Sequence, residues 1–230
     1  MIVLEAMAVH SSKSGPLLRI CGDEFIAGLA DLRRRMGDVS ESRVVPQIIH
    51  FLKISRNGYR QKVGDLTPEE IAGIRDAYAA AAERARRAGF DGVELHMAHA
   101  YTLSSFLSRR NQRPDEWGRT LENRLRLPSE TLAAVRAAVG ADFPVGIRFL
   151  AEECIKDGAT VEETQLTALR FAQLGADWLS LSHGGKFEDA VAKPGSLSIP
   201  TPVIVGIAAC QVNSTPTART SRARRRSRPS

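Results

Sequence analysis

The densest group of side chains able to do chemistry lies in residues 89–101, which read GFDGVELHMAHAY. Side chains alternate between the two faces of a strand, so a strand in this segment places Glu94 and His96 on one face. A reversal of the chain after the strand would bring His99 and Tyr101 back over the same strand end. Two imidazoles and a phenol that meet there can bind a metal, act as acid and base, or hydrogen-bond a substrate oxygen.

A metal site is the weakest of these alternatives, because no nearby carboxylate or third imidazole follows at a familiar ligand spacing. Cys21, Cys154 and Cys210 are widely spaced and form no C-x-x-C pattern. Neither a disulfide framework nor a zinc or iron–sulfur site is therefore predicted. Histidines that serve only the structure are the competing interpretation, and spacing alone does not decide between function and structure.

Short apolar runs alternate with longer segments of helical periodicity along the chain. The expected strands are 2–4, 44–49, 92–97, 144–149, 178–182 and 202–207, and the expected helices are 23–36, 67–88, 127–139 and 161–174. The second helix begins with a capping box, since Glu70 follows Thr67 by three positions. The strands are apolar enough to be covered on both faces, which favours a parallel α/β sheet.

Polar residues follow the ends of several predicted strands, and this distribution selects between two parallel architectures. A doubly wound sheet usually carries a Gly-rich phosphate turn after its first strand, and none is present. A (β/α)8 TIM barrel instead collects function at the carboxyl ends of successive strands. The residues concerned are His50, His96, His99, Arg148, Ser182 and His183. Six strands fall short of the eight that close a barrel, so an incomplete barrel is predicted.

Composition indicates a globular chain, with 230 residues, 43% apolar and 25% charged. The net charge of +6 has a local origin, because residues 211–230 contain six arginines and no acidic residue while residues 1–210 balance 26 basic against 26 acidic side chains. We expect a folded domain over 1–209 and a disordered Arg/Ser/Pro-rich tail over 210–230.

The basic tail raises the hypothesis of electrostatic binding to RNA or DNA. It has no aromatic residue on which bases could stack, so nucleic acid is not the expected partner. No run approaches the roughly 20 apolar residues of a membrane span, and no secretory signal is recognised at the N-terminus. A cytoplasmic location is the expectation.

The segment around the two histidines resembles the old yellow enzyme family of FMN-dependent NAD(P)H:flavin oxidoreductases and ene reductases. The similarity covers about residues 1–208 and is best between 44 and 150. It continues in order through the motifs FLS (106–108), NQR (111–113), DEWG (115–118) and LENR (121–124). A Gln-x-x-His strand at 47–50 and the run FPVGIR at 143–148 extend it on either side.

The resemblance implies an FMN site with NADH or NADPH as the reductant. Gln47 corresponds to the glutamine at the flavin pyrimidine edge, and Arg148 to the arginine beside flavin N1 and O2, where a cation favours the anionic reduced ring. Gly206 corresponds to part of the phosphate-binding end.

The resemblance also implies a substrate, a small electrophilic alkene conjugated to a carbonyl. His96 and His99 correspond to the pair that hydrogen-bonds the carbonyl oxygen, which stabilises the charge that develops there. Tyr101 corresponds to the proton donor to the α-carbon. Together these residues predict reduction of activated alkenes by hydride transfer from reduced flavin.

The sequence departs from the family at both ends. The first and last barrel strands are not recognised, and the change to Arg/Ser/Pro-rich sequence suggests truncation or a shifted reading frame. Gly118-Arg119 stands where the family usually has Gly-Gly. An open barrel exposes strand edges, so pairing into a homo-oligomer is expected. The competing hypothesis is a catalytically silent fragment that does not retain FMN.

Overall fold

A computed structural model describes residues 1–12, 17–52, 61–184 and 207–211; of 207–211 it describes only the backbone. One six-stranded sheet runs through the molecule, with its strands side by side in chain order. The strands are β1 (Ile2–Ala8), β2 (Val44–Ile49), β3 (Val93–Met97), β4 (Val145–Glu152), β5 (Trp178–His183) and β6 (Ile207–Gln211). β1 to β5 are parallel, as the apolar runs predicted.

The sixth strand differs from its prediction. Residues 202–206 lie outside the described residues, while β6 begins at Ile207 and runs antiparallel to β5. Cys210 and Gln211, assigned from composition to the disordered tail, belong to this strand. Backbone pairing with β5 explains the difference, because a sheet edge can hold a short segment that has no apolar periodicity of its own.

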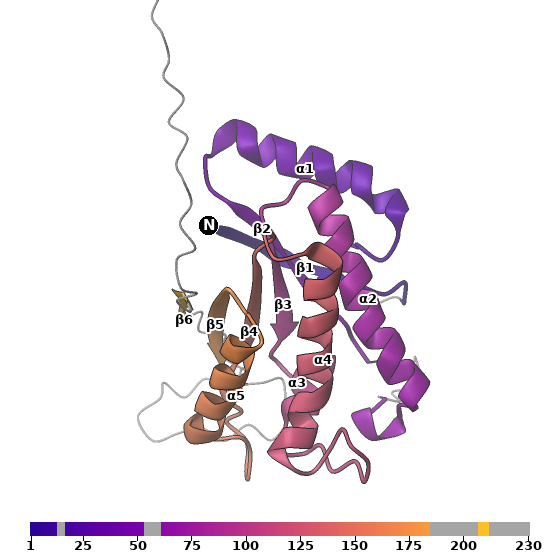
Figure 1. Ribbon diagram of the computed structural model, residues 1–230, viewed down its shortest axis with the longest axis vertical. Helices are drawn as coiled ribbons and strands as arrows, with labels where there is room; N and C mark the ends of the chain where they lie inside the picture. The colour runs from indigo at the N-terminus through magenta and orange to yellow at the C-terminus, as the bar shows by residue number, and fades with distance from the viewer. Residues whose placement is uncertain (13–16, 53–60, 185–206, 212–230) are drawn as a thin grey trace, which may run out of the picture.

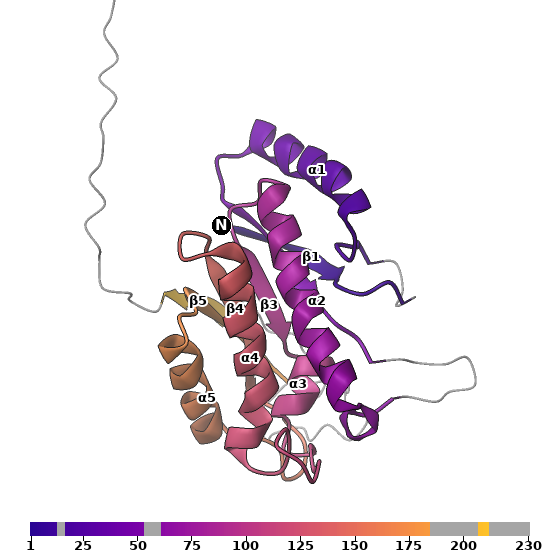
Figure 2. The same ribbon diagram turned by 45° about the vertical axis from the view of Figure 1, so that its right-hand side comes forward.

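The helices join successive strands and gather on one side of the sheet, in front of the strands in both views (Figures 1 and 2). The α-helices are α1 (Ile26–Val39), α2 (Pro68–Arg87), α3 (Thr102–Leu107), α4 (Leu121–Val139) and α5 (Val161–Gln173). Two 3-10 turns precede them, η1 (Asp23–Phe25) before α1 and η2 (Val63–Asp65) before α2. A parallel sheet with helices on its outer side is the arrangement of a (β/α)8 barrel, and the described residues form six strands of such a sheet, the last one antiparallel.

The helix boundaries show which helix starts could be predicted from local sequence signals. Thr67 and Glu70 form the predicted capping box of α2, with Thr67 Oγ1 accepting from the Glu70 N–H and Glu70 accepting from the Thr67 N–H. α4 begins at Leu121 rather than at residue 127, because Thr120 caps it by accepting from the Asn123 N–H. Pro128 lies inside this helix. Among the described helices, none has the length and apolar character that crossing a bilayer demands.

Alternation along the strands gives the sheet two different faces. Val93, Leu95 and Met97 of β3 belong to the hydrophobic core, and so do Ile147 and Phe149 of β4. The intervening positions carry polar side chains that turn away from the helices. The helix-covered face therefore stabilises the sheet, while the opposite face is available to build a site.

Gly146 on β4 leaves room for one large side chain of the neighbouring strand to lie over it. It pairs in register with Glu94 on one side and Trp178 on the other. The Trp178 indole lies over Gly146, where an added Cβ would be 1.8 Å from the ring. The missing side chain lets the indole extend over β4 toward β3.

We predict that Gly146→Ala displaces the Trp178 ring and lowers the free energy of unfolding by about 1–3 kcal/mol, the usual cost of overpacking. Urea unfolding, monitored by circular dichroism, measures this loss in the free energy of unfolding. Gly73→Ala is the matched control, because an added Cβ at this exposed position of α2 meets nothing within 4 Å. That control should gain about 0.5–1 kcal/mol. Equal stability of Gly146→Ala and wild type would contradict the close packing.

Candidate active site

A cavity of about 350 Å³ lies on the polar face of the sheet. It brings together five of the predicted site residues, namely Gln47, His96, His99, Tyr101 and Arg148. Ile49, Phe51, Leu17 and residues 3–6 of β1 complete its wall. The sixth predicted residue, Gly206, lies outside the described residues.

A buried carboxylate organises the floor of this site. Glu94 is 0% exposed and accepts four hydrogen bonds. Its Oε1 accepts from Gln47 Nε2 at 2.7 Å and from Arg148 Nε at 2.9 Å. Its Oε2 accepts from Trp178 Nε1 at 3.1 Å and from Ser180 Oγ at 2.6 Å. A buried charge is tolerated only when it is paired and hydrogen-bonded in this way.

Sequence reasoning gave Glu94 no role beyond sharing a face with His96. The available signal was a carboxylate inside an otherwise apolar strand, since charged residues are seldom fully buried without a partner. Its donors come from three other strands, and no local pattern links them.

The carboxylate fixes the orientation of two cavity side chains. The Gln47 amide must point its NH2 group at Glu94, because a carboxylate can only accept, so Oε1 remains as an acceptor. Arg148 uses Nε on the same carboxylate oxygen. Among the described residues its terminal nitrogens have no protein partner, which leaves them as donors at the cavity wall.

The two histidines contact each other, as the predicted chain reversal required. His99 Nδ1 lies 3.3 Å from His96 Nε2, and His99 Nε2 lies 2.7 Å from Ser182 Oγ. His96 Nδ1 accepts from the Ala98 N–H at 3.2 Å, so neutral His96 carries its proton on Nε2. His96 Nε2 can then donate to His99 Nδ1, in which case neutral His99 carries its proton on Nε2 and donates to Ser182 Oγ.

The reversal itself depends on an uncommon backbone conformation. His99 and Ala100 both have φ of 58°, a left-handed region that non-glycine residues seldom adopt. These two residues turn the chain from β3 into α3, which begins at Thr102 with Tyr101 as its N-cap residue. Such strained positions concentrate at functional sites.

Tyr101 lies against two other rings at the cavity. Its ring meets Phe51 edge-on, with centroids 4.7 Å apart, and His96 edge-on at 5.1 Å. Edge-to-face packing fixes the ring without using its hydroxyl. Tyr101, His96 and His99 therefore converge, as predicted from the sequence.

His50 and Tyr78 hold the backbone next to His96 and Tyr101 in place through hydrogen bonds. His50 Nδ1 lies 2.9 Å from Thr102 Oγ1, which ties the end of β2 to the start of α3. The buried Tyr78 hydroxyl accepts from the His50 N–H at 3.0 Å and donates to the His96 carbonyl at 3.5 Å. Burial raises the pKa of the Tyr78 phenol far above its usual value, so this bridge stays protonated.

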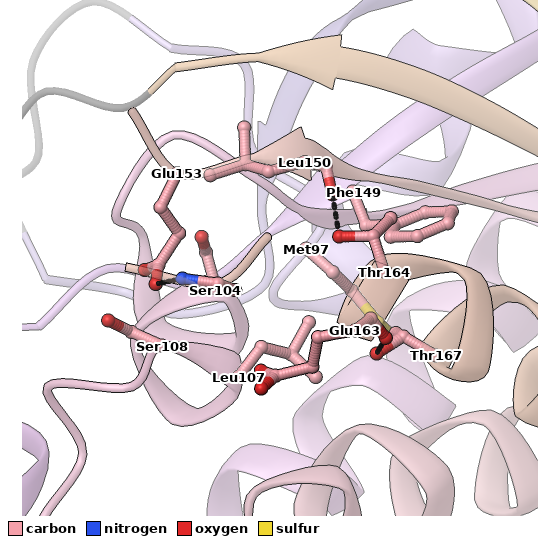
Figure 3. A pocket seen from close by; sticks show the side chains of 11 residues that line it. Met97, Ser104, Leu107, Ser108, Phe149, Leu150, Glu153, Glu163, Thr164 and Thr167 are labelled. Carbon is pink, nitrogen blue, oxygen red and sulfur yellow. Dashed lines mark hydrogen bonds between the residues drawn. The ribbon is translucent and has the colours of Figure 1, made fainter. Parts of the chain in front are cut away.

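A second, much smaller cavity lies on the helix side of the sheet, between α3, α5 and the end of β4 (Figure 3). Its volume is about 30 Å³, enough for a water molecule but not for a substrate. Glu153 accepts there from the N–H groups of Arg109 and Ala159 through Oε2, while its buried Oε1 has no partner among the described residues. A bound water fits that oxygen.

Two arginines of the segment between α3 and α4 are engaged with other parts of the protein. Arg109 pairs with Glu163 at 2.8 Å, and Arg113 donates to Asp115 and to the carbonyls of Val63 and Leu66. These contacts fasten the loop between α3 and α4 to its neighbours rather than presenting cations to the cavity.

Comparisons with known proteins agree with this geometry. Residues 36–196 match the model of the NADH:flavin oxidoreductase / NADH oxidase family. The NADH oxidase of Thermoanaerobacter brockii is 40% identical over 185 residues, which are 73% of this chain and 28% of that protein. The cinnamate reductase of Clostridium sporogenes is 44% identical over 95 residues, or 40% of this chain and 14% of that protein.

A solved structure extends the likeness to the fold. The old yellow enzyme homologue from Zymomonas mobilis superposes with a TM-score of 0.69 at 21% identity, covering 84% of this chain and 63% of the other. The chain thus spans less than a third of the length of the two curated relatives.

We predict that Glu94→Gln lowers the free energy of unfolding by about 3–5 kcal/mol, because an amide turns an NH2 group toward donors that need an acceptor. Urea unfolding measures this loss. Glu41→Gln, at an exposed position, is the control and should change stability by no more than about 0.5 kcal/mol. An effect of Glu94→Gln as small as that of the control would show that the four hydrogen bonds are not jointly required.

Proposed function

Because the chain belongs to the NADH:flavin oxidoreductase / NADH oxidase family, we propose that it is the FMN-dependent part of an oxidoreductase that reduces activated alkenes. The match to this family confirms the resemblance inferred from the motifs. NADH or NADPH is the proposed reductant and an α,β-unsaturated carbonyl compound the proposed substrate. The observation that carries the proposal is the convergence of Gln47, Arg148, His96, His99 and Tyr101 on one cavity.

The described residues fit the edge of a flavin ring. Gln47 offers an acceptor, since its NH2 group is held by Glu94, and a flavin pyrimidine edge has an N–H to donate. Arg148 offers terminal N–H donors for the oxygen and nitrogen acceptors of the same edge. When bound, reduced FMN would supply a hydride to the β-carbon of the alkene.

The histidine pair would hold the substrate oxygen. His96 carries its proton on Nε2, at the side of the ring that faces His99. When the substrate oxygen replaces the contact between the two rings, His99 would take the tautomer with its proton on Nδ1 and present that N–H to the same oxygen, while Ser182 donates to its Nε2. Two donors aimed at one carbonyl oxygen stabilise the enolate-like charge that develops there.

Tyr101 would complete the addition with a proton. Its ring is fixed between Phe51 and His96, and its side chain lines the cavity. A phenol held beside the α-carbon can deliver a proton to it, the role of a general acid. The cinnamate reductase relative supports this substrate class, since cinnamate is an alkene conjugated to a carboxylate.

The competing possibility, a chain that does not retain FMN, predicts a different outcome in one titration. The purified protein is examined for flavin absorbance, and FMN is then added while quenching of its fluorescence is followed. Saturable binding at one FMN per chain supports the proposed enzyme. A colourless protein that leaves FMN fluorescence unchanged supports the silent fragment.

We predict that Tyr101→Phe slows alkene reduction by about 100-fold or more while sparing reduction of the flavin by NAD(P)H, because only alkene reduction needs the proton. Stopped-flow flavin absorbance separates the two half-reactions. Equal losses in both would contradict a proton-donor role.

The role of the histidines is tested by measuring the binding of a phenol, an oxygen ligand that forms a coloured complex on oxidised flavin. We expect His96→Ala to weaken phenol binding at least about tenfold, the loss of one hydrogen bond to a charged group. Tyr101→Phe is the control and should retain most of that affinity.

A further inference from the structure

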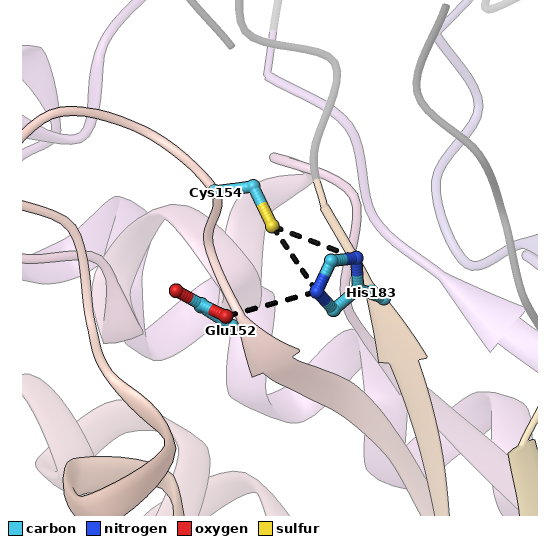
Figure 4. A group of neighbouring side chains, drawn as sticks. All are labelled: Glu152, Cys154 and His183. Carbon is cyan, nitrogen blue, oxygen red and sulfur yellow. Dashed lines mark hydrogen bonds and ion pairs between the residues drawn. The ribbon is translucent and has the colours of Figure 1, made fainter. Parts of the chain in front are cut away.

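Three potential metal ligands meet where β4 and β5 end, apart from the cavity described above (Figure 4). Glu152 and His183 are cross-strand partners in the parallel pair β4–β5. Cys154 follows two residues after Glu152, just beyond the end of β4. Glu153, between them, turns to the helix side instead. The sheet register therefore brings a carboxylate, a thiol and an imidazole together.

The distances match those between ligands of one small cation. Cys154 Sγ lies 3.3 Å from His183 Nε2, and Glu152 Oε2 lies 3.7 Å from the same nitrogen. All three ligand atoms lie within 4.8 Å of one another. In a tetrahedral zinc site, bond lengths near 2.0–2.3 Å place neighbouring ligand atoms about 3.4–3.6 Å apart.

The arrangement differs from a catalytic cysteine–histidine–carboxylate relay. A relay needs the thiol at one imidazole nitrogen and the carboxylate at the other, so that a proton can cross the ring. Here Sγ lies 3.3 Å from Nε2 and 3.5 Å from Nδ1, while Glu152 faces Nε2. The thiol is therefore not held at the nitrogen opposite the carboxylate, and the contact that both ligands share at Nε2 favours coordination over a relay.

The backbone at Cys154 also departs from the ordinary. Its φ is 55°, in the left-handed region that a non-glycine residue seldom adopts. The thiol of this residue contacts the His183 ring at the end of β5. Gly184 N donates to the Glu152 carbonyl at 3.1 Å, which holds the two strand ends together beneath the three side chains.

We propose that Glu152, Cys154 and His183 form a binding site for a zinc-class divalent cation. A thiolate, an imidazole and a carboxylate are the ligand types that Zn²⁺ uses, and the two anionic ligands neutralise its charge. Three protein ligands leave a fourth position for water or an added ligand. The His183 side chain is 42% exposed and Glu152 16%, so a cation can enter from solvent.

The site is separate from the flavin chemistry but is joined to it by the strands. His183 directly follows Ser182, whose hydroxyl contacts His99, and Glu152 ends the strand that carries Arg148. A bound cation would therefore brace the ends of two strands that carry active-site residues. Sequence analysis did not find it, because Cys154 and His183 are 29 positions apart and on different strands.

Cobalt(II) is the probe, because it occupies zinc sites and shows a charge-transfer band when a thiolate is a ligand. The full chain, stripped of metal and kept reduced, is titrated with Co²⁺ and then with Zn²⁺. We expect a saturable thiolate band at one Co²⁺ per chain that Zn²⁺ abolishes. Cys154→Ser should lose the band, and His183→Ala should weaken Co²⁺ binding at least about tenfold.

Cys21→Ser and Cys210→Ser are the matched controls, because they remove the other two thiols of the chain. Both should keep the band and the affinity of wild type. Circular dichroism checks that each variant is folded, and the exposed position of His183 makes its variant the safer one. Absence of a thiolate band in the wild type, or a band that survives Cys154→Ser, would overturn the proposal.

Discussion

The polar face of this protein depends on one buried charge. Glu94 is fully removed from solvent, so its carboxylate is stable only while donors satisfy both oxygens. The donors come from β2, β4 and β5, which means that one side chain ties four strands at a single level of the sheet. A one-residue slip of any of these strands would move its donor to the opposite face and leave the charge uncompensated.

The same strand that buries Glu94 also presents His96, two residues further toward the cavity. Their separation is fixed by the strand repeat, so the residues proposed to meet the flavin edge and those proposed to hold the substrate oxygen share one support. Tyr78 and His50 then attach the turn behind His96 to β2 and α3. These two hydrogen bonds hold in place the part of the site that must aim hydrogen bonds.

Much of the sheet could be predicted because apolar periodicity and capping are local properties. The strand from 92 to 97 and the capping box at Thr67 were found in this way. α3 was missed, since six residues carry too little periodicity to stand out. The positions of Gln47 and Arg148 came from family resemblance, whereas their common partner Glu94 lies 47 and 54 positions away from them. Contacts at such separations are created by the fold and cannot be read from spacing.

The partnership of Arg148 with Glu94 also changes what the arginine can do. A guanidinium whose charge is offset by a carboxylate at 2.9 Å exerts little long-range field on the cavity. Its terminal N–H groups still donate, and donation strengthens as negative charge builds on the acceptor. In the proposed flavin site, the arginine would thus favour a ring edge that becomes anionic through short directed hydrogen bonds rather than through net charge. That distinction matters in an open cavity, because solvent screens a distant charge far more than it weakens a hydrogen bond already formed.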